Sequence, residues 1–368
     1  MIQNTNRLRE LDFLRGVAII LVLLRHLPLT PFTSKMGWIG VDLFFVLSGF
    51  LVSGLLFKEY NKFGNIKPKL FLIRRGFKIY PIYFLTYFLY LSIKLVKGQF
   101  LWKGLLADVF FIQNYIMGWG YAYVATWSLA IEEHFYFFFA ILLYFAIKKS
   151  FFNLKFNSKW SYFEIVILLL LIIIFILRLY SNYYHPELKE KNVTMTHLRM
   201  DSLLFGVLIS YFYYFKNQIL TNFFNNNKRL LIIIAVILLM FTPFIDFEDS
   251  IFVRTFGFTF LYISFGIFLI SFLVYQNINS VLNKMFSERV VNFISRIGLA
   301  SYSIYLIHGF VAVSFSFLRS YVFKIQVDPI VLFPFTATTS IVLGMIMTNY
   351  IEKYFLTIRD KFYPSRIA

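Results

Sequence analysis

The stretch FLRGVAIILVLLRHLPL, residues 13–29, decides the fold class of this chain. It is apolar except for Arg15, Arg25 and His26, and it is long enough to span a membrane as one helix. Arg15 and His26 stand eleven residues apart, close to three helical turns, so their side chains project from nearly the same face. Because a cation and an imidazole are costly to keep in lipid, we predict that this face lines a functional site.

Apolar runs of similar length recur along the whole sequence. Of the 368 residues, 59% are hydrophobic, which is far more than a soluble protein of this size needs. We therefore predict an all-α, polytopic membrane protein with one transmembrane domain over residues 1–368 and no appended soluble domain. The apolar stretch 101–117 contains Lys103 and Asp108, so we interpret it as a re-entrant or interfacial piece. The ten predicted spans are 13–29, 38–57, 79–97, 127–147, 162–182, 199–216, 230–246, 254–275, 299–320 and 330–351.

The formal net charge of +18 is explained by a membrane rather than by nucleic acid. With ten spans, about twice as many Lys and Arg residues lie on the side of the N-terminus as on the other side, which by the positive-inside rule predicts that both termini are cytoplasmic. An eleventh span at 101–117 would place every later loop on the opposite side of the membrane, and the excess of Lys and Arg on the side of the N-terminus would be lost. The first span has no small-residue cleavage site after it, so we interpret it as a retained helix.

Cysteine is absent, which excludes a disulfide framework, a thiolate nucleophile and a cysteine metal site. No metal-ligand spacing, glycine-rich phosphate loop or nucleotide-binding fingerprint stands out. We therefore predict no metal and no bound cofactor.

His26 is the strongest candidate catalytic residue. The rise of about 16 Å from Arg15 to His26 is roughly half of a ~30 Å hydrocarbon core, so the imidazole lies near mid-depth. Histidine titrates near neutral pH and can act as a general base. The alternative is a structural histidine that is hydrogen-bonded between helices. On the same helix, Asp12 can pair with Arg15 three residues later, and Gly16 permits another backbone to come close.

A basic cluster, Arg74-Arg75-Gly76-Phe77-Lys78, precedes the third predicted span. Three cations in five residues could hold phosphates by charge and by forked hydrogen bonds. The alternative is that the cluster anchors the topology and attracts anionic lipid headgroups.

Two adjacent carboxylates, Glu132 and Glu133, enter the fourth predicted span. Adjacent positions on a helix point about 100° apart, so both cannot serve one partner on one face. Because a carboxylate in hydrocarbon is expensive, we expect one of them to face the bundle interior and pair with an Arg or His. Trp127, at the start of this span, is interpreted as an interface anchor.

Other polar residues are candidates for supporting roles. Asp42, near the outer end of the second span, could cap a helix, whereas Ser48-Gly49 after it suits close helix packing. Arg199 and Asp201 are expected to form a structural pair at the start of the sixth span. The supporting set also includes Ser128 and, in the ninth span, Tyr302 and His308, which rank below His26.

The sequence resembles the integral-membrane acyltransferase family 3, whose members O-acylate sugars of bacterial surface polysaccharides and some small molecules. Six segments carry the resemblance in the same order along the chain. Two departures stand out: Lys78 replaces the usual Arg of the basic cluster, and His134 replaces a usual Gln, so His134 receives no catalytic role. The matching segments are Leu11–Gly16 with the Arg15–His26 spacing, Phe44–Leu51, Arg74–Pro81, Thr126–Tyr136, Arg199–Asp201 and Ser301–His308.

The resemblance implies a multi-pass protein of the bacterial inner membrane that uses cytoplasmic acyl-coenzyme A, with acetyl as the default, as its co-substrate. The acceptor would be a hydroxyl of an extracytoplasmic or lipid-linked carbohydrate. Arg15 and His26 would be central to transfer, and the basic cluster would serve the donor. We expect His26 to take the acceptor proton, and Glu133, or else Glu132, to orient its imidazole. Direct transfer and an acyl-enzyme on Ser or His both stay open.

The rival interpretation from another class is a proton-coupled secondary transporter or lipid-linked-sugar flippase, because buried Arg, His and Glu also serve carriers. A non-catalytic membrane scaffold is a third hypothesis. A carrier predicts transport without thiol release from acetyl-coenzyme A. A scaffold predicts that His26→Ala and Arg15→Ala leave the phenotype intact.

Overall fold

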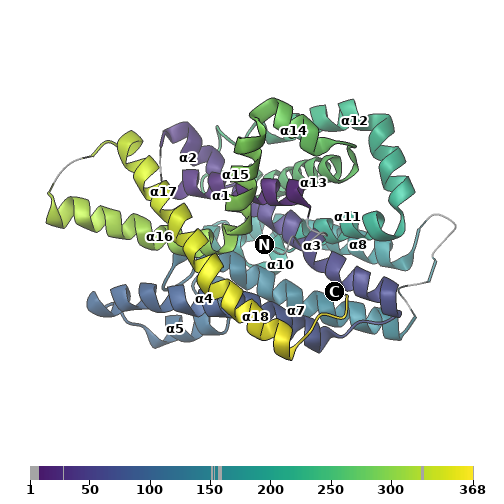
Figure 1. Cartoon of the computed structure of the whole chain (residues 1–368), viewed down its shortest axis with the longest axis horizontal. Helices are drawn as coiled ribbons and strands as arrows, with labels where there is room; N and C mark the ends of the chain where they lie inside the picture. The colour runs from purple at the N-terminus through teal and green to yellow at the C-terminus, as the bar shows by residue number, and fades with distance from the viewer. Residues whose placement is uncertain are drawn as a thin grey trace.

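The computed structural model of the chain describes residues 8–27, 29–150, 152, 154–155, 160–324 and 327–367, so the predicted N-terminal tail before Leu8 lies outside the described residues. Over the described ranges the chain is helical, with one isolated β-bridge between Lys155 and Ser161 and no strand. The prediction of an all-α fold is confirmed (Figure 1). The principal helices are α1 (Arg9–His26), α2 (Pro31–Gly37), α3 (Gly40–Phe63), α4 (Pro68–Val96), α5 (Trp102–Val109), α6 (Gln113–Ile116), α7 (Trp127–Lys148), α8 (Tyr162–Tyr184), α9 (Lys189–Thr194), α10 (Thr196–Arg199), α11 (Asp201–Phe215), α12 (Asn217–Leu239), α13 (Phe258–Val274), α14 (Ile278–Phe286), α15 (Glu288–Leu299), α16 (Ser301–Phe317), α17 (Pro329–Met347) and α18 (Lys353–Phe362).

Eight helical segments within the described residues are long and apolar enough to cross a membrane. They contain α3, α4, α7, α8, α12, α13, α16 and α17, each of which overlaps a predicted span, although α12 begins at Asn217 and ends at Leu239 where the prediction was 230–246. The other two predicted spans correspond to α1, which carries Asp12, Arg15 and Arg25 among its charges, and α11, which is apolar but only 15 residues long. The chain is therefore a multi-pass membrane protein, while the count of ten and the cytoplasmic termini stay predictions.

The stretch 101–117 forms two short helices, α5 and α6, rather than a spanning helix. The carboxylate of Asp108 ties this region to the chain before α7, because it accepts hydrogen bonds from the backbone N–H groups of Tyr121 (3.0 Å) and Ala122 (2.8 Å). Asp108 is fully buried, and this loss of solvation raises its pKa to about 6 despite both bonds.

Close backbone contacts through glycine place α1 at the centre of the bundle. A methyl group on Gly16 would lie 2.2 Å from the carbonyl oxygen of Ile294 in α15, and one on Gly298 would lie 1.8 Å from that of Asp12. The two helices therefore touch backbone to backbone, as the sequence predicted for Gly16. Gly49 of α3 makes the same kind of approach to α11, where a methyl group would meet the Leu203 carbonyl at 2.0 Å.

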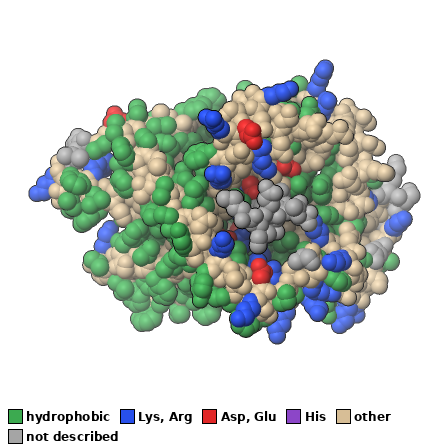
Figure 2. All heavy atoms as spheres, viewed as in Figure 1, with side chains coloured by type: hydrophobic (Ala, Val, Ile, Leu, Met, Phe, Trp, Pro, Cys, Tyr) green, Lys and Arg blue, Asp and Glu red, His purple; other side chains and the backbone are tan. Residues whose placement is uncertain are grey.

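Hydrophobic and basic side chains are concentrated in different parts of the surface. Hydrophobic side chains dominate the left half of the face in Figure 2, over α4, α5, α16 and α17, as expected of a lipid-facing surface. Lys and Arg side chains are more frequent around the centre and at the lower right (Figure 2). In Figure 1, α18 crosses in front of α4 on this same face.

Candidate functional site

Two cavities lie at opposite ends of α1, and each contains one of the two residues singled out on it. The Arg15 cavity, of about 360 Å³, is lined by Asp12, Arg15, Ser48, Arg75, Lys78 and Glu132, among others. The His26 cavity, of about 810 Å³, is lined by Arg25, His26, Trp38, Trp119, Trp127 and Glu190, among others. Val41 and Tyr305 line both cavities, so the two meet there.

Arg15 lies on the α1 face that borders the first of these cavities. One guanidinium nitrogen donates a hydrogen bond to Ser301 Oγ (3.1 Å) at the start of α16. Across the cavity, Glu132 of α7 accepts a hydrogen bond of 2.6 Å from Ser48 of α3. The cavity thus contains both cationic and anionic groups supplied by several helices.

The predicted donor cluster is divided by the structure. Arg75 lines the Arg15 cavity and stacks its guanidinium over the Tyr136 ring, 4.5 Å from the centroid. Lys78 also lines the cavity, and its Nζ lies 4.0 Å from the Glu352 carboxylate.

Arg74, the third member of the predicted donor cluster, does not line the Arg15 cavity with Arg75 and Lys78. Its guanidinium donates to Asp360 Oδ1 (2.9 Å) and to the Tyr363 carbonyl oxygen. Both partners belong to α18 and the residue after it, so Arg74 fastens the C-terminal segment to α4. The physical reason is helical geometry, because adjacent residues point about 100° apart.

His26 ends α1 with an exposed side chain that borders the His26 cavity. Its Nδ1 lies 3.1 Å from the Val22 carbonyl oxygen of the preceding turn. A ring nitrogen that faces a carbonyl carries the proton, so Nε2 holds the lone pair. The ring therefore has a basic nitrogen available to a ligand in the cavity.

His308 of α16 has the structural role that was the alternative for His26. It is fully buried, with Nδ1 2.7 Å from the Tyr305 carbonyl oxygen and Nε2 2.9 Å from the Tyr123 hydroxyl. The two imidazole rings lie 5.0 Å apart. Tyr123, the partner of His308, was not singled out from the sequence, because nothing in the spacing links the two residues.

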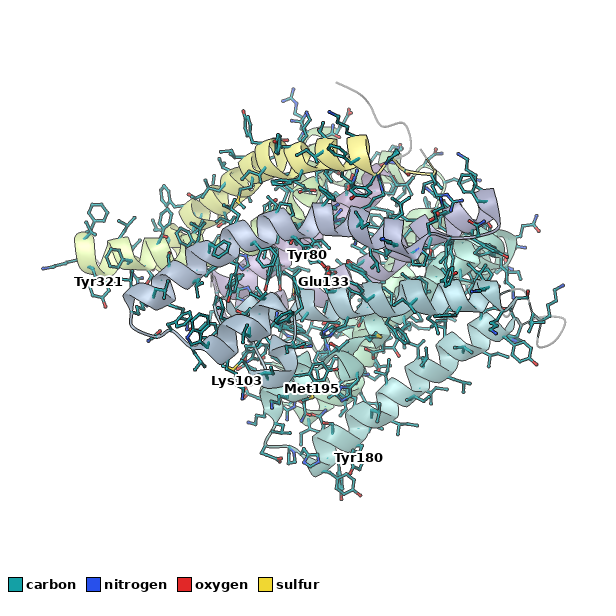
Figure 3. The ribbon with its side chains drawn as sticks, turned by 90° about the horizontal axis from the view of Figure 1, so that it is seen from below. Tyr80, Lys103, Glu133, Tyr180, Met195 and Tyr321 are labelled. Carbon is teal, nitrogen blue, oxygen red and sulfur yellow. The ribbon has the colours of Figure 1, made fainter. Side chains whose placement is uncertain are left out.

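The paired glutamates do not contact His26. Glu133 accepts a hydrogen bond from the Tyr80 hydroxyl (2.9 Å) between α7 and α4, where both side chains are labelled in Figure 3. Glu132 faces the Arg15 cavity instead. The expectation that Glu133 orients the imidazole is therefore not met by this geometry, and the Val22 carbonyl does so. The predicted ion pair of one glutamate with an Arg or His is not found among the described residues, because Glu132 bonds Ser48 and Glu133 bonds Tyr80.

The expected pair of Arg199 and Asp201 is wrong. Arg199 donates to Asp42 Oδ1 (2.8 Å) of α3, and Asp201 accepts from Arg178 of α8 (2.5 Å). All four side chains are buried. The crossed pairing joins α3 to the end of α10 and α8 to the start of α11, and it gives Asp42 an ion-pair partner rather than a helix-capping role. Arg178 was not singled out from the sequence, although it lies within the predicted span 162–182.

The remaining predicted residues surround the point where the cavities meet. Trp127 is buried, so it is not a lipid-interface anchor but part of the His26 cavity wall. Ser128 Oγ lies 2.7 Å from the Tyr305 hydroxyl. Tyr302 lines the Arg15 cavity and donates to the Ile79 carbonyl (2.8 Å). Among the described residues, no cluster of three or more His, Cys, Asp or Glu side chains could hold a metal ion.

Comparison with known proteins agrees with this architecture. The protein named "putative O-acetyltransferase" in Staphylococcus aureus (strain COL) is 28% identical over 370 residues, which cover 94% of this chain and 56% of that protein. A peptidoglycan O-acetyltransferase of Listeria monocytogenes is 30% identical over 142 residues, or 34% of this chain and 22% of that one. An O-acetyltransferase of Staphylococcus aureus (strain NCTC 8325) is 29% identical over 153 residues, or 38% and 25% of the two chains.

The chain thus spans a little over half the length of the Staphylococcus aureus (strain COL) relative. No solved structure matches it. A family model described as an acyltransferase domain matches residues 8–349, which is nearly the whole chain. With its multi-pass helical fold and its two cavities along α1, this protein belongs to the acyltransferase 3 family.

Proposed function

We propose that the protein is a membrane O-acyltransferase that moves an acetyl group from acetyl-coenzyme A to a hydroxyl of a carbohydrate in the cell envelope. One observation carries the proposal: the two ends of α1 open into two cavities that meet at Val41 and Tyr305. One cavity has cations suited to an anionic donor, and the other has an imidazole with an available nitrogen.

The Arg15 cavity suits the donor. Arg15, Arg75 and Lys78 place three cationic side chains along its wall, and coenzyme A carries phosphates that such groups bind. In the predicted topology this end of the bundle is cytoplasmic, where acetyl-coenzyme A is available. The thin pantetheine arm would extend towards Tyr305 and bring the thioester to the junction of the cavities.

The His26 cavity suits a glycan acceptor. Trp38, Trp119 and Trp127 line it, and indole rings pack against the apolar faces of sugar rings. Carboxylates of Glu187 and Glu190 also line the cavity and can accept hydrogen bonds from sugar hydroxyls. The names of the relatives, which include a peptidoglycan O-acetyltransferase, favour the same substrate class.

The chemistry at the junction is a direct transfer. The acceptor oxygen attacks the thioester carbonyl while His26 Nε2 takes its proton. A C–O bond forms, the C–S bond breaks, and the coenzyme A thiolate takes up the proton from the His26 imidazolium. The Val22 carbonyl holds the Nδ1 proton throughout, so the ring stays in the tautomer that exposes the basic nitrogen.

The test uses the purified full-length protein in proteoliposomes with acetyl-coenzyme A and an N-acetylglucosamine oligosaccharide. We expect acceptor-dependent release of free thiol and an acetyl ester on the sugar, both lost in His26→Ala. His197→Ala is the matched control, because this histidine bonds Tyr115 and borders neither cavity. Transport of the sugar by folded protein without thiol release would favour a carrier instead.

A further inference from the structure

Tyr305 stands at the boundary between the two cavities, and its hydroxyl joins their walls. It donates a hydrogen bond to the Ala125 carbonyl oxygen (2.8 Å) and lies 2.7 Å from Ser128 Oγ. Ala125 lines the His26 cavity, and Ser128 lines the Arg15 cavity. Only 6% of Tyr305 is exposed, although it borders both spaces.

Val41 completes the boundary from the first turn of α3. It packs against the same apolar cluster that contains Tyr305, and it lines both cavities as Tyr305 does. Phe44, one turn further along α3, meets the Tyr305 ring edge to face with centroids 6.5 Å apart. The boundary is therefore one aromatic ring packed against two side chains of a single helix.

We propose that Val41 and Tyr305 form a septum between the Arg15 cavity and the His26 cavity, and that the Tyr305 side chain limits the size of the acyl group that crosses it. The second part rests on the proposed function. A septum answers a physical need, because an enzyme with aqueous cavities at both ends of one helix must prevent ions from leaking through the membrane. Opening it breaks the two hydrogen bonds of the Tyr305 hydroxyl, to the Ala125 carbonyl and to Ser128, both of which are between neutral groups.

The first test needs no acyl transfer. Because the chain has no cysteine, an introduced cysteine is its single thiol. Leu51→Cys places the thiol in the Arg15 cavity, and Val124→Cys places it in the His26 cavity. A charged, membrane-impermeant methanethiosulfonate is added to one side of sealed vesicles at a time. With Tyr305 present, we expect each thiol to react from one side, and the two from opposite sides.

Tyr305→Ala should let the reagent cross the septum. Leu51→Cys should then react at least about tenfold faster from the side that labels Val124→Cys, whereas Tyr305→Phe, which keeps the ring, should leave the labelling unchanged. If Tyr305→Ala does not fold, Tyr305→Leu removes the ring and retains apolar packing. The septum would be ruled out if Leu51→Cys were labelled from both sides with Tyr305 in place. It would also be ruled out if removal of the Tyr305 ring left the labelling unchanged.

The second test measures acyl length by thiol release. The ratio of kcat/KM for butyryl-coenzyme A to that for acetyl-coenzyme A should rise about tenfold in Tyr305→Ala, less in Val41→Ala, and not in Tyr305→Phe, as expected when extra methylenes gain room. An unchanged ratio would overturn the size limit. Failure of the proposed function is separate, because it would show as no acetyl-coenzyme A turnover by the unmodified protein.

Discussion

The imidazole rings of His26 and His308 lie 5.0 Å apart, yet only one of them has a nitrogen available for chemistry. Both nitrogens of His308 face partners, at Tyr305 and Tyr123, whereas among the described residues only Nδ1 of His26 does. Two histidines that the sequence places in separate spans thus lie side by side, the proposed base His26 bordering the cavity and His308 buried next to it.

Replacing His26 should therefore reduce acyl transfer, whereas replacing His308 should reduce stability. His26→Ala removes an exposed ring that bonds only its own helix, so we expect acyl transfer to fall at least about 100-fold while the thermal midpoint hardly changes. His308→Ala leaves a cavity and removes the 2.9 Å partner of the Tyr123 hydroxyl, and should cost about 2–4 kcal/mol of stability. Thiol release and thermal unfolding in detergent measure the two effects. Equal destabilisation by both changes would contradict this division of roles.

Arg74 and Arg75 are adjacent in the sequence, but we expect their alanine variants to have different effects. Arg75→Ala removes a cation from the donor cavity, so the KM for acetyl-coenzyme A should rise about 10-fold or more, the value of one charge-assisted hydrogen bond. Arg74→Ala should leave this KM within about threefold and release the segment around Asp360, which protease sensitivity of the C-terminal end would report. Asp360→Asn is the control, since it should reproduce the Arg74 effect. A large increase in this KM in Arg74→Ala would instead indicate that Arg74 binds acetyl-coenzyme A.

The crossed ion pairs can be tested by double-mutant cycles. Removing one partner from Arg178–Asp201 or Arg199–Asp42 leaves a buried charge uncompensated, which costs about 3–5 kcal/mol. Thermal unfolding of single and double alanine variants should give coupling energies above about 1 kcal/mol for these two pairs. The Arg199–Asp201 cycle should give a clearly smaller value. Strong coupling only in that cycle would support the pairing expected from the sequence.

Gly298 sets the position of α1. A methyl group there would lie 1.8 Å from the Asp12 carbonyl oxygen, so Gly298→Ala must push α1 and α15 apart, at a cost of about 1–3 kcal/mol or more. Because α1 carries both Arg15 and His26, thiol release should fall as well. Leu299→Ala, an exposed change on the same helix, should alter neither measurement.

Asp108 should make stability depend on pH. Burial raises its folded-state pKa to about 6, above the ordinary value of 3.8 for an aspartate, so between these pH values the native protein binds a proton that the unfolded chain does not hold. Stability from this group therefore increases as the pH falls from 7 towards 4, by an amount on the order of 2 kcal/mol. Thermal unfolding from pH 7 to 5 should show about 1 kcal/mol of this gain in the native protein and none in Asp108→Asn. The same slope in both would assign it to other groups.

The sequence by itself determined the fold class and most of the helices. Hydrophobic runs must be helical in lipid, because each backbone polar group has to be satisfied within its own segment, and this holds whatever the neighbours are. The same local physics made Arg15 and His26 conspicuous, since the cost of a polar group in a membrane depends on its own chemistry. Gly16 and Gly49 were predictable as contact points for the same reason, because their small size is a local property.

Only the tertiary structure decided which side chains meet. Arg199 pairs with Asp42 rather than Asp201, and Glu133 bonds Tyr80 rather than His26, because partners are chosen by how helices pack and not by distance along the chain. The sequence could not show that Arg15 and His26 open into different cavities, nor that Tyr305 stands between them. A cavity is the space left by several helices at once, so no single segment of sequence specifies it.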